Sequence, residues 1–387
     1  MLQVIQLTPP GRGAVATLRI EGPGAVEVVQ AHFHARGGRP LATYPVDRLV
    51  VGRFGPDRGE EVVVRCCTAG AVELHCHGGL AAVAAIEESL MTAGCRRLAW
   101  PDWAAERETE PFASAALVAL ADARTERTAA ILFDQYCGAL SLALGDIRQA
   151  IDRGDHDAVQ QQIDMLLNRV DLGRHLVQPW RVVLAGRVNV GKSSLINALA
   201  GYGRSIVHPT PGTTRDAVTL TTAIDGWPVE LCDTAGLRVG SDAVELAGIE
   251  RARERLAQAD LAILVFDRST TWSAEDQRLV DQCPDALLVH NKCDLPFTSD
   301  ARPVGTVPIF VSAKMGLSPL ALELPPVAQK SQQARPAGLS VSALQGRGMA
   351  ELLDAITRRL VPDPPPPGAA VPFTAEQVEA VKQLSAS

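Results

Sequence analysis

The sequence lacks the features that would place it in a membrane or in a secretory pathway. No apolar run approaches the roughly 20 residues that a transmembrane helix needs. The N-terminus has no basic start followed by a long apolar stretch, so no signal peptide is expected. We therefore expect a cytoplasmic protein with no membrane partner.

Cysteine pairs with metal-binding or redox spacing are also missing. The eight cysteines include no C-x-x-C motif, and several lie in apolar runs typical of strands, where a thiol packs as a small hydrophobe. We interpret them as reduced and structural. The net charge of −7 excludes a chain covered in positive charge for nucleic acid, but not a local basic patch.

The pattern of apolar and polar residues changes along the 387 residues of the chain. This length allows two or three domains, each with its own hydrophobic core. Residues 1–112 mix short apolar runs with an Ala-rich helical run, which favours a small α+β domain. Residues 113–178 follow a helical rhythm. Residues 179–362 alternate β-rich and helical segments, the pattern of a doubly wound, mostly parallel α/β sheet. Residues 363–387 begin as a proline-rich, stiff and extended linker and end in a short helix.

A phosphate-binding loop is the clearest motif. Residues 186–193 read G-x-x-x-x-G-K-S, directly after an apolar strand and before a helical run. Glycines let backbone N–H groups wrap phosphates, and the helix N-terminus adds positive potential. Lys192 would bridge the β- and γ-phosphates and serve catalysis, and the Ser193 hydroxyl would bind Mg²⁺. The nucleotide-binding residues expected here are Asn189, Val190, Gly191, Lys192, Ser193 and Ser194.

Two motifs typical of switch segments follow the phosphate loop. Asp233-Thr234-Ala235-Gly236 comes after a strand, where an aspartate can hold Mg²⁺ through water and the glycine N–H can sense the γ-phosphate. Between the two motifs, Thr214 in the segment G-T-T-R-D can complete the Mg²⁺ shell. Their order along the chain supports a nucleoside triphosphate as the ligand.

The segment Asn291-Lys292-Cys293-Asp294 indicates which base is bound. The Asp294 carboxylate can accept hydrogen bonds from both N1–H and N2–H₂ of guanine, whereas adenine offers no such donor pair on that edge. Asn291 would tie this loop to the phosphate loop, and the stem of Lys292 would cover the ring. This motif is the main reason for predicting GTP rather than ATP.

A last loop should offer Ser-Ala backbone contacts to the base, and two segments qualify. Ser342-Ala343-Leu344 is followed by a good amphipathic helical run over residues 349–360. Ser312-Ala313-Lys314 is closer to Asp294 but runs into several prolines. We favour Ser342–Leu344 and keep Ser312–Lys314 as the alternative.

With these motifs assigned, the chain resembles the tRNA-modification GTPase family called MnmE or TrmE over most of residues 1–362. The matching sequence segments are TPPGRGAVATLRIEG (8–22), VELHCHGG (72–79), GRVNVGKSSLINAL, PGTTRD and DTAGLR. The order of a folate-binding domain, then helices interrupted by a G domain, also matches. The resemblance implies a P-loop GTPase that forms a homodimer through its G and N-terminal domains. It also implies a role in wobble-uridine modification of tRNA, with a flavoprotein partner.

The resemblance further implies cations and a catalytic acid. Ser193 and Thr214 match the family's Mg²⁺ ligands. Leu237 stands where related GTPases place a glutamine that orients the attacking water, so another residue must do this. Glu245 matches the glutamate that has this role in the family. Without the family, Glu245 is only an exposed carboxylate at a helix start. The K⁺ site would be lined by Asn189, His208, Thr210 and Thr213. The matching segment adds His208, Pro209, Thr210, Pro211, Gly212, Thr213 and Thr214 to the nucleotide site.

Two points leave the function of the whole chain open. Arg19 and Glu73 match contacts to a tetrahydrofolate derivative, but they also fit a strand-edge charge and its partner. The sequence given ends at Ser387, without the C-x-G-K ending of the family. A second hypothesis is therefore a GTP-switched binding or assembly factor that lacks the modification chemistry. A third, a nucleotide-binding scaffold with little hydrolysis, is disfavoured by Glu245 and Asn189.

Overall fold

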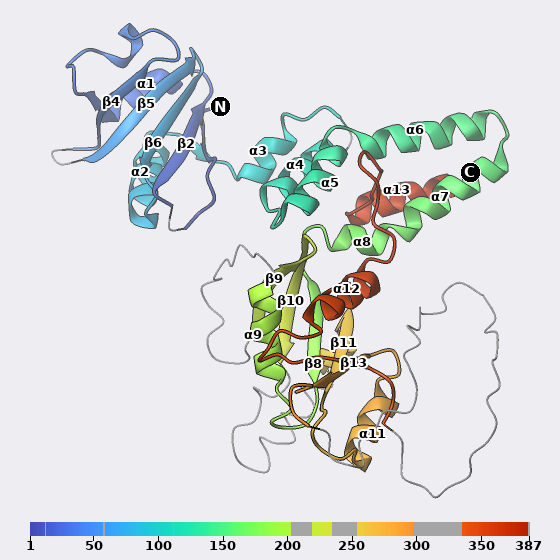
Figure 1. The fold of residues 1–387 in the computed structure, drawn as a ribbon. Coiled ribbons are helices and arrows are strands. Elements are labelled where there is room, and N and C mark those ends of the chain that lie inside the picture. Colours follow the sequence, from blue (N-terminus) through green and yellow to red (C-terminus); the bar gives the residue numbers. More distant parts are fainter. Residues whose placement is uncertain are drawn as a thin grey trace, which may run out of the picture. The chain divides into compact units, whose positions relative to one another are not determined.

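The chain folds into two compact units, Met1–Val118 and Ala119–Ser387, which are taken in turn (Figure 1). The structure is a computed structural model. It describes residues 1–11, 13–56, 59–110, 112–202, 219–233, 254–296 and 335–385.

The first unit is built on one seven-stranded sheet in the order β3-β4-β5-β6-β2-β1-β7. Its strands are β1 (Gln3–Gln6), β2 (Val15–Glu21), β3 (Phe33–Ala35), β4 (Leu49–Phe54), β5 (Glu60–Thr68), β6 (Ala71–His77) and β7 (Arg96–Arg97). Neighbouring strands are antiparallel except β1 and β7, which are parallel. The helical elements of this unit are α1 (Ala25–His32), η1 (Leu41–Thr43), α2 (Leu80–Thr92) and α3 (Trp100–Ala105).

Alternation along β2 and β6 divides this sheet into an apolar face and a charged face. Leu18 and Leu74 are fully buried in a core that also takes in Val29 of α1 and Ile86 of α2. The strand register then places Arg19 of β2 opposite Glu73 of β6 on the other face. The expected α+β architecture is confirmed.

The second unit begins with a run of short helices, of which the first, α4, straddles the boundary between the units. They are α4 (Ala113–Ala121), α5 (Glu126–Tyr136), α6 (Ala139–Asp152), α7 (His156–Asn168) and α8 (Val170–Arg174). The breaks have local causes, since Thr125 caps α5, Asp155 caps α7, and Gly138 takes a left-handed conformation before α6. Within the described ranges, no single helix is long and apolar enough to cross a membrane; α5 and α6, bent by 49°, pass that test only as a pair.

The proline-rich segment near the C-terminus contacts these helices instead of standing free. Its residues form neither helix nor strand, as the sequence predicts, but a turn joins the Ala369 N–H to the Pro366 carbonyl, so the segment is not extended throughout. Val371 is fully buried, and its N–H donates to Gln135 Oε1 at 3.0 Å. The amide of Gln135 in turn donates to the Ala369 carbonyl at 2.9 Å. Beyond this segment, α13 (Ala375–Ser385) packs against α7.

A six-stranded sheet in the order β13-β12-β11-β8-β10-β9 forms the rest of the second unit. Its strands are β8 (Trp180–Ala185), β9 (Thr219–Ile224), β10 (Trp227–Asp233), β11 (Leu261–Asp267), β12 (Leu287–Asn291) and β13 (Leu339–Ser340). The helices described around it are α9 (Lys192–Tyr202), α11 (Ala274–Gln282) and α12 (Met349–Leu360) (Figure 1).

All strand pairs in this sheet are parallel except β9 and β10, which form a hairpin around Asp225-Gly226. Ile263 to Phe266 of β11 are all buried, as expected of a strand covered on both faces. The doubly wound, mostly parallel fold expected from the sequence is confirmed. Such a sheet brings the carboxyl ends of its strands, and the loops that follow them, to one edge.

Candidate nucleotide-binding site

The phosphate loop follows β8 at this edge. At both of its glycines, a side chain would clash with a neighbouring segment. Gly186 has φ +149° and Gly191 has φ +92°, conformations that side chains rarely adopt. A Cβ on Gly186 would lie 2.2 Å from the Val265 carbonyl oxygen. A Cβ on Gly191 would lie 2.4 Å from Nδ2 of Asn291. The loop is therefore packed tightly against β11 and against the end of β12.

Lys192 begins helix α9 and its ammonium group lies inside the loop. The residue is only 5% exposed, and Nζ donates to the carbonyl oxygens of Gly186 and Arg187, each at 2.8 Å. A cation is therefore held among the backbone groups that would surround phosphate oxygens. Ser194 comes two residues later on the same helix.

Ser193 and Asp233 bring two oxygen atoms together at the end of β10. The Ser193 hydroxyl donates to Asp233 Oδ2 at 2.7 Å, and the Asp233 residue is buried. Hydroxyl and carboxylate oxygens are the donors that Mg²⁺ prefers in proteins. The two motifs that carry these residues are 40 positions apart, and the parallel pairing of β8 with β10 joins them.

Asn291 links the phosphate loop to two other parts of the chain. Its side chain is buried, with Nδ2 donating to the Val190 carbonyl at 3.0 Å. Its Oδ1 accepts from the backbone N–H of Ala343 at 3.1 Å. The contact between Asn291 and the phosphate loop that the sequence suggests is thus present, and residues 342–344 lie beside it.

Asp294 meets the same Ser-Ala segment. The Ser342 hydroxyl donates to Asp294 Oδ1 at 2.5 Å. This hydrogen bond lowers the pKa of Asp294, as do a backbone hydrogen bond and the charges of Arg347 and Lys292, so the half-buried carboxylate is ionised at neutral pH. An ionised carboxylate accepts hydrogen bonds only, which suits the two donors on the guanine edge. Leu344 follows with its side chain exposed.

Several predicted site residues lie outside the described residues, so their roles stay predictions. They are Glu245, the segment from His208 through Pro209, Thr210, Pro211, Gly212 and Thr213 to Thr214, the three residues Thr234, Ala235 and Gly236, and the alternative loop Ser312–Lys314. Asn189 is described and has φ +63°, a left-handed conformation that asparagine tolerates, but nothing tests its role in K⁺ binding.

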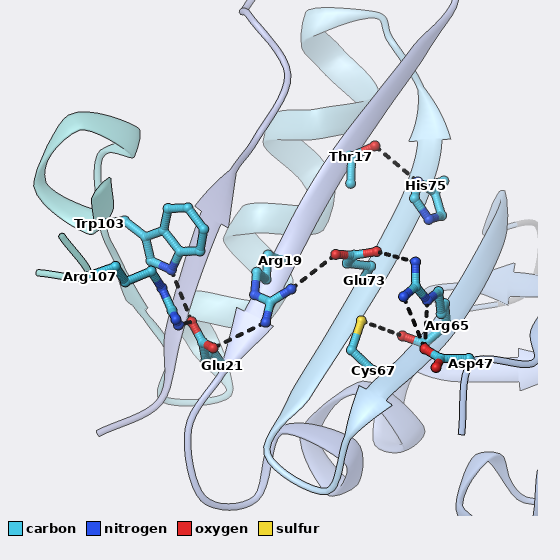
Figure 2. A network of polar contacts seen from close by, with 10 residues as sticks. All are labelled: Thr17, Arg19, Glu21, Asp47, Arg65, Cys67, Glu73, His75, Trp103 and Arg107. Carbon is cyan, nitrogen blue, oxygen red and sulfur yellow. Dashed lines mark hydrogen bonds and ion pairs between the residues drawn. The ribbon is translucent and has the colours of Figure 1, made fainter. Parts of the chain in front are cut away.

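In the first unit, Arg19 and Glu73 contact each other. Arg19 Nη1 lies 3.0 Å from Glu73 Oε1, and the other carboxylate oxygen lies 3.6 Å from Nη1 of Arg65 (Figure 2). The interpretation as a charge and its partner therefore describes the structure, and a role in folate binding stays a prediction. Among the described residues, no group of three or more His, Cys, Asp or Glu side chains could hold a metal ion.

Figure 2 shows that this ion pair belongs to a longer row of alternating charges. Glu21 accepts from Trp103 Nε1 at 2.9 Å and forms ion pairs with Arg19 and Arg107. Burial alone would raise its pKa, but these three donors outweigh burial and lower the pKa of Glu21 to about 2. The arginines and carboxylates of this row neutralise one another, so this face of the sheet carries both signs of charge.

Two residues at the nucleotide site were not expected from the sequence. Asp267 ends β11 beside Asn291, and its only signal was a carboxylate after an apolar strand, as at Asp233. Arg335 contacts the loop after β11 and had no signal, because it belongs to no motif and lies in a proline-containing run before Ser342.

The geometry at the sheet edge defines the class of protein. A glycine-rich loop that surrounds a lysine, a serine–aspartate pair and an ionised N-K-x-D aspartate beside a Ser-Ala loop together define a GTP-binding protein of the P-loop GTPase class. Two family models match the chain. The model described as 50S ribosome-binding GTPase matches residues 181–292, and that described as GTP-binding protein TrmE N-terminus matches residues 4–101.

Curated proteins resemble both units together. The tRNA modification GTPase MnmE of Geobacillus thermodenitrificans is 33% identical over 341 residues, which cover 77% of this chain and 74% of that protein. MnmE of Heliobacterium modesticaldum is 34% identical over 358 residues, covering 80% and 77%. The chain therefore belongs to the tRNA modification GTPase MnmE family, and it is a GTP-hydrolysing enzyme. A crystal structure of Aquifex aeolicus Era bound to GDP.AlF4⁻ is 22% identical and covers 50% of this chain and 59% of that chain, but its TM-score of 0.31 supports no conclusion.

Proposed function

We propose that this chain hydrolyses GTP at the described sheet edge in support of wobble-uridine modification of tRNA. The observation that carries the proposal is the meeting of three loops at one side chain. Asn291 bonds the phosphate loop through the Val190 carbonyl and the Ser-Ala loop through the Ala343 N–H. The phosphate loop and residues 291–294, the base-reading loop, are thereby held at a fixed separation.

The described residues have distinct tasks in this proposal. The backbone N–H groups of the phosphate loop and Lys192 would bind the phosphates, where Lys192 would neutralise the charge that develops on the γ-phosphoryl group. Ser193 would bind Mg²⁺ directly and Asp233 through water, with Thr214 as a further ligand. Asp294 would read the guanine edge, while Ser342 fixes its carboxylate and the backbone of Ala343 and Leu344 borders the base.

Family membership supports the remaining parts of the proposal. Glu245 would orient the attacking water, and K⁺ bound by Asn189, His208, Thr210 and Thr213 would supply positive charge beside the phosphates. The chain would work as a homodimer with a flavoprotein partner and act on tRNA, which places it in the cytoplasm.

A tetrahydrofolate derivative is a further proposed ligand of the first unit. Arg19 and Glu73 offer a cation and an acceptor side by side on the charged face of the sheet, both partly exposed. These groups suit a ligand that has both carboxylates and N–H donors. Loss of tetrahydrofolate binding in the variant Arg19→Ala, measured by calorimetry, would support this ligand, and unchanged binding would remove it.

Three experiments test the proposed function. The rate of GTP hydrolysis by the full chain should rise when Na⁺ is replaced by K⁺ at constant ionic strength, and Glu245→Ala should abolish turnover while GDP still binds. Deleting the gene should remove a wobble-uridine modification from cellular tRNA. Intact modification together with K⁺-stimulated hydrolysis would favour the GTP-switched assembly factor instead.

A further inference from the structure

Asp267 provides a charged partner for the lysine of the base-reading loop. Strands β11 and β12 are parallel and pair Asp267 with Asn291, so Lys292 follows directly beyond that pair. Asp267 Oδ2 lies 2.6 Å from Lys292 Nζ, and the two side chains are 10% and 32% exposed. Oδ1 accepts from the backbone N–H of Ser269 at 2.9 Å and from its hydroxyl at 2.7 Å. Both carboxylate oxygens are therefore fixed.

Lys292 has an unusual backbone conformation, and the end of its side chain is fixed by hydrogen bonds. Its backbone has φ +62°, which is unusual for a residue with a long side chain. Its ammonium group donates to the Asn189 carbonyl of the phosphate loop at 2.7 Å as well as to Asp267. A free lysine side chain loses roughly 2 kcal/mol of rotamer entropy when it is ordered. Here Asp267 orders the side chain before a nucleotide arrives.

Arg335 holds the loop that carries Asp267. The residue is 4% exposed, and its guanidinium donates to the carbonyl oxygens of Asp267 at 3.2 Å, Arg268 at 3.4 Å and Thr270 at 2.5 Å. The guanidinium also lies 5.6 Å from the centre of the Trp272 ring. A buried cation is costly unless its donors are satisfied. Nη1 and Nη2 of Arg335 bond to these carbonyls, whereas its buried Nε has no hydrogen-bond partner among the described residues, and the bonds from Nη1 and Nη2 fix the backbone from which Asp267 projects.

The neighbouring residue extends the same support to β12. The Pro336 carbonyl lies 3.0 Å from Nε2 of His290, which is buried and directly precedes Asn291. Residues 335 and 336 thus contact both the loop after β11 and the strand that leads into the base-reading loop. A segment distant in sequence from both motifs joins the two.

We propose that Asp267 and Arg335 are positioning residues for guanine nucleotides. In this inference, which rests on the proposed function, Asp267 fixes Lys292 so that its stem covers the base, and Arg335 fixes the backbone of Asp267. Neither residue touches the reacting phosphates. The effect should therefore fall on nucleotide affinity and not on the chemical step.

The charge state of Asp267 agrees with this role. Burial alone would raise its pKa, but the hydrogen bond from Lys292 and those from Ser269, with the Lys292 charge, outweigh burial. The pKa of Asp267 is consequently below its usual range, and the carboxylate is ionised at neutral pH. A charge-assisted bond to Lys292 is stronger than a neutral one.

A double-mutant cycle in GDP affinity tests the inference. Asp267→Asn and Lys292→Met should each weaken GDP binding to the full chain by about ten- to a hundredfold, the range for one hydrogen bond to a charged group. The double variant should bind no more weakly than the weaker single variant. Arg335→Lys should weaken binding when Lys292 is present and have no further effect in the Lys292→Met background. Asp354→Asn, which removes one exposed ion pair from α12, is the matched control and should bind like the wild type.

The outcomes separate this inference from the proposed function. Losses that multiply in the double variant would show that Asp267 does not act through Lys292 and would overturn the inference. A wild-type chain that binds ADP as well as GDP would overturn the proposed function itself. If Asp267→Asn does not fold, as judged by thermal unfolding, Ser269→Ala replaces it. That variant loosens Asp267 without removing its charge, and its effect must disappear in the Lys292→Met background.

Discussion

At the scale of single residues, Gly191 determines whether the two halves of the nucleotide site can approach each other. Any side chain there would meet the Asn291 amide, since a Cβ would lie 2.4 Å from Nδ2. The left-handed φ of Gly191 adds strain for any other residue. The phosphate loop and the base-reading loop therefore share a contact that a single methyl group disrupts.

We predict that Gly191→Ala weakens GDP binding by at least about tenfold, the cost of one buried hydrogen bond. Calorimetry at 25 °C would measure the dissociation constant. Gly201→Ala is the matched control, because a Cβ there meets no atom within 4 Å. Equal GDP affinity in the two variants would contradict the arrangement described for Asn291.

His290 makes a second prediction at this scale, on pH. Burial is the main cause that lowers the pKa of His290 from 6.5 to about 4; the hydrogen bond to Pro336 acts in the opposite direction, and the charges of Arg335 and Arg268 lower the pKa as well. Because the folded pKa lies below the unfolded one, the unfolded chain binds the proton first. The contribution of His290 to stability is therefore complete above pH 6.5 and is lost as the pH falls towards 4.

Denaturant unfolding of the full chain between pH 7 and pH 4 would measure this loss, which amounts to about 3 kcal/mol for His290. The variant His290→Gln should show a shallower decline over the same interval, whatever its stability at pH 7. Parallel declines in the two proteins would mean that His290 is not buried in its neutral form.

At the scale of elements, the C-terminal segment depends on Gln135 of α5. That side chain pairs with two backbone groups of the segment, the carbonyl of Ala369 and the N–H of Val371. Val371 itself is fully buried. The segment is therefore part of the helical core, and its prolines stiffen a docked chain and not a free spacer.

We predict that Gln135→Ala destabilises the chain by about 2 kcal/mol, because it leaves two backbone groups without their partner. The variant should also be cleaved earlier by protease between α12 and α13. Gln149→Ala, at an exposed position on α6, is the control. Unfolding midpoints and cleavage rates that match this control would show that the segment docks without Gln135.

At the scale of the whole molecule, local sequence patterns predicted the alternation of strands and helices in the second sheet and the motifs that follow its strands. They succeeded because each motif carries its chemistry within a few residues, as Lys192 and Ser193 do, and because parallel strands bring their carboxyl ends together. Choosing Ser342 over Ser312 relied on the helix that follows it, and the structure places Ser342 against Asp294. The role of that contact in base binding stays a prediction.

Contacts between distant segments were beyond the reach of sequence patterns. Gln135 and Ala369 are separated by 234 positions, and nothing local marks either as a partner. Arg335 is equally unmarked, because its hydrogen bonds go to three backbone carbonyls, and its one ring contact, with Trp272, lies 63 positions away in the sequence. Of the two predicted catalytic residues, Lys192 is described, whereas Glu245 lies outside the described residues and its role rests on the sequence alone.

One site at the carboxyl edge of the second sheet binds phosphates and selects guanine, and calorimetric titration of the full chain with GDP and with ADP in Mg²⁺ buffer decides whether it does. This site geometry predicts that GDP binds at least about a hundredfold more tightly than ADP, because the Asp294 carboxylate would face adenine without the two donors that guanine offers. It also predicts that Asp294→Asn moves the preference towards xanthosine diphosphate, whose ring offers one donor and one acceptor to an amide. Equal affinities of the wild type for GDP and ADP would contradict it.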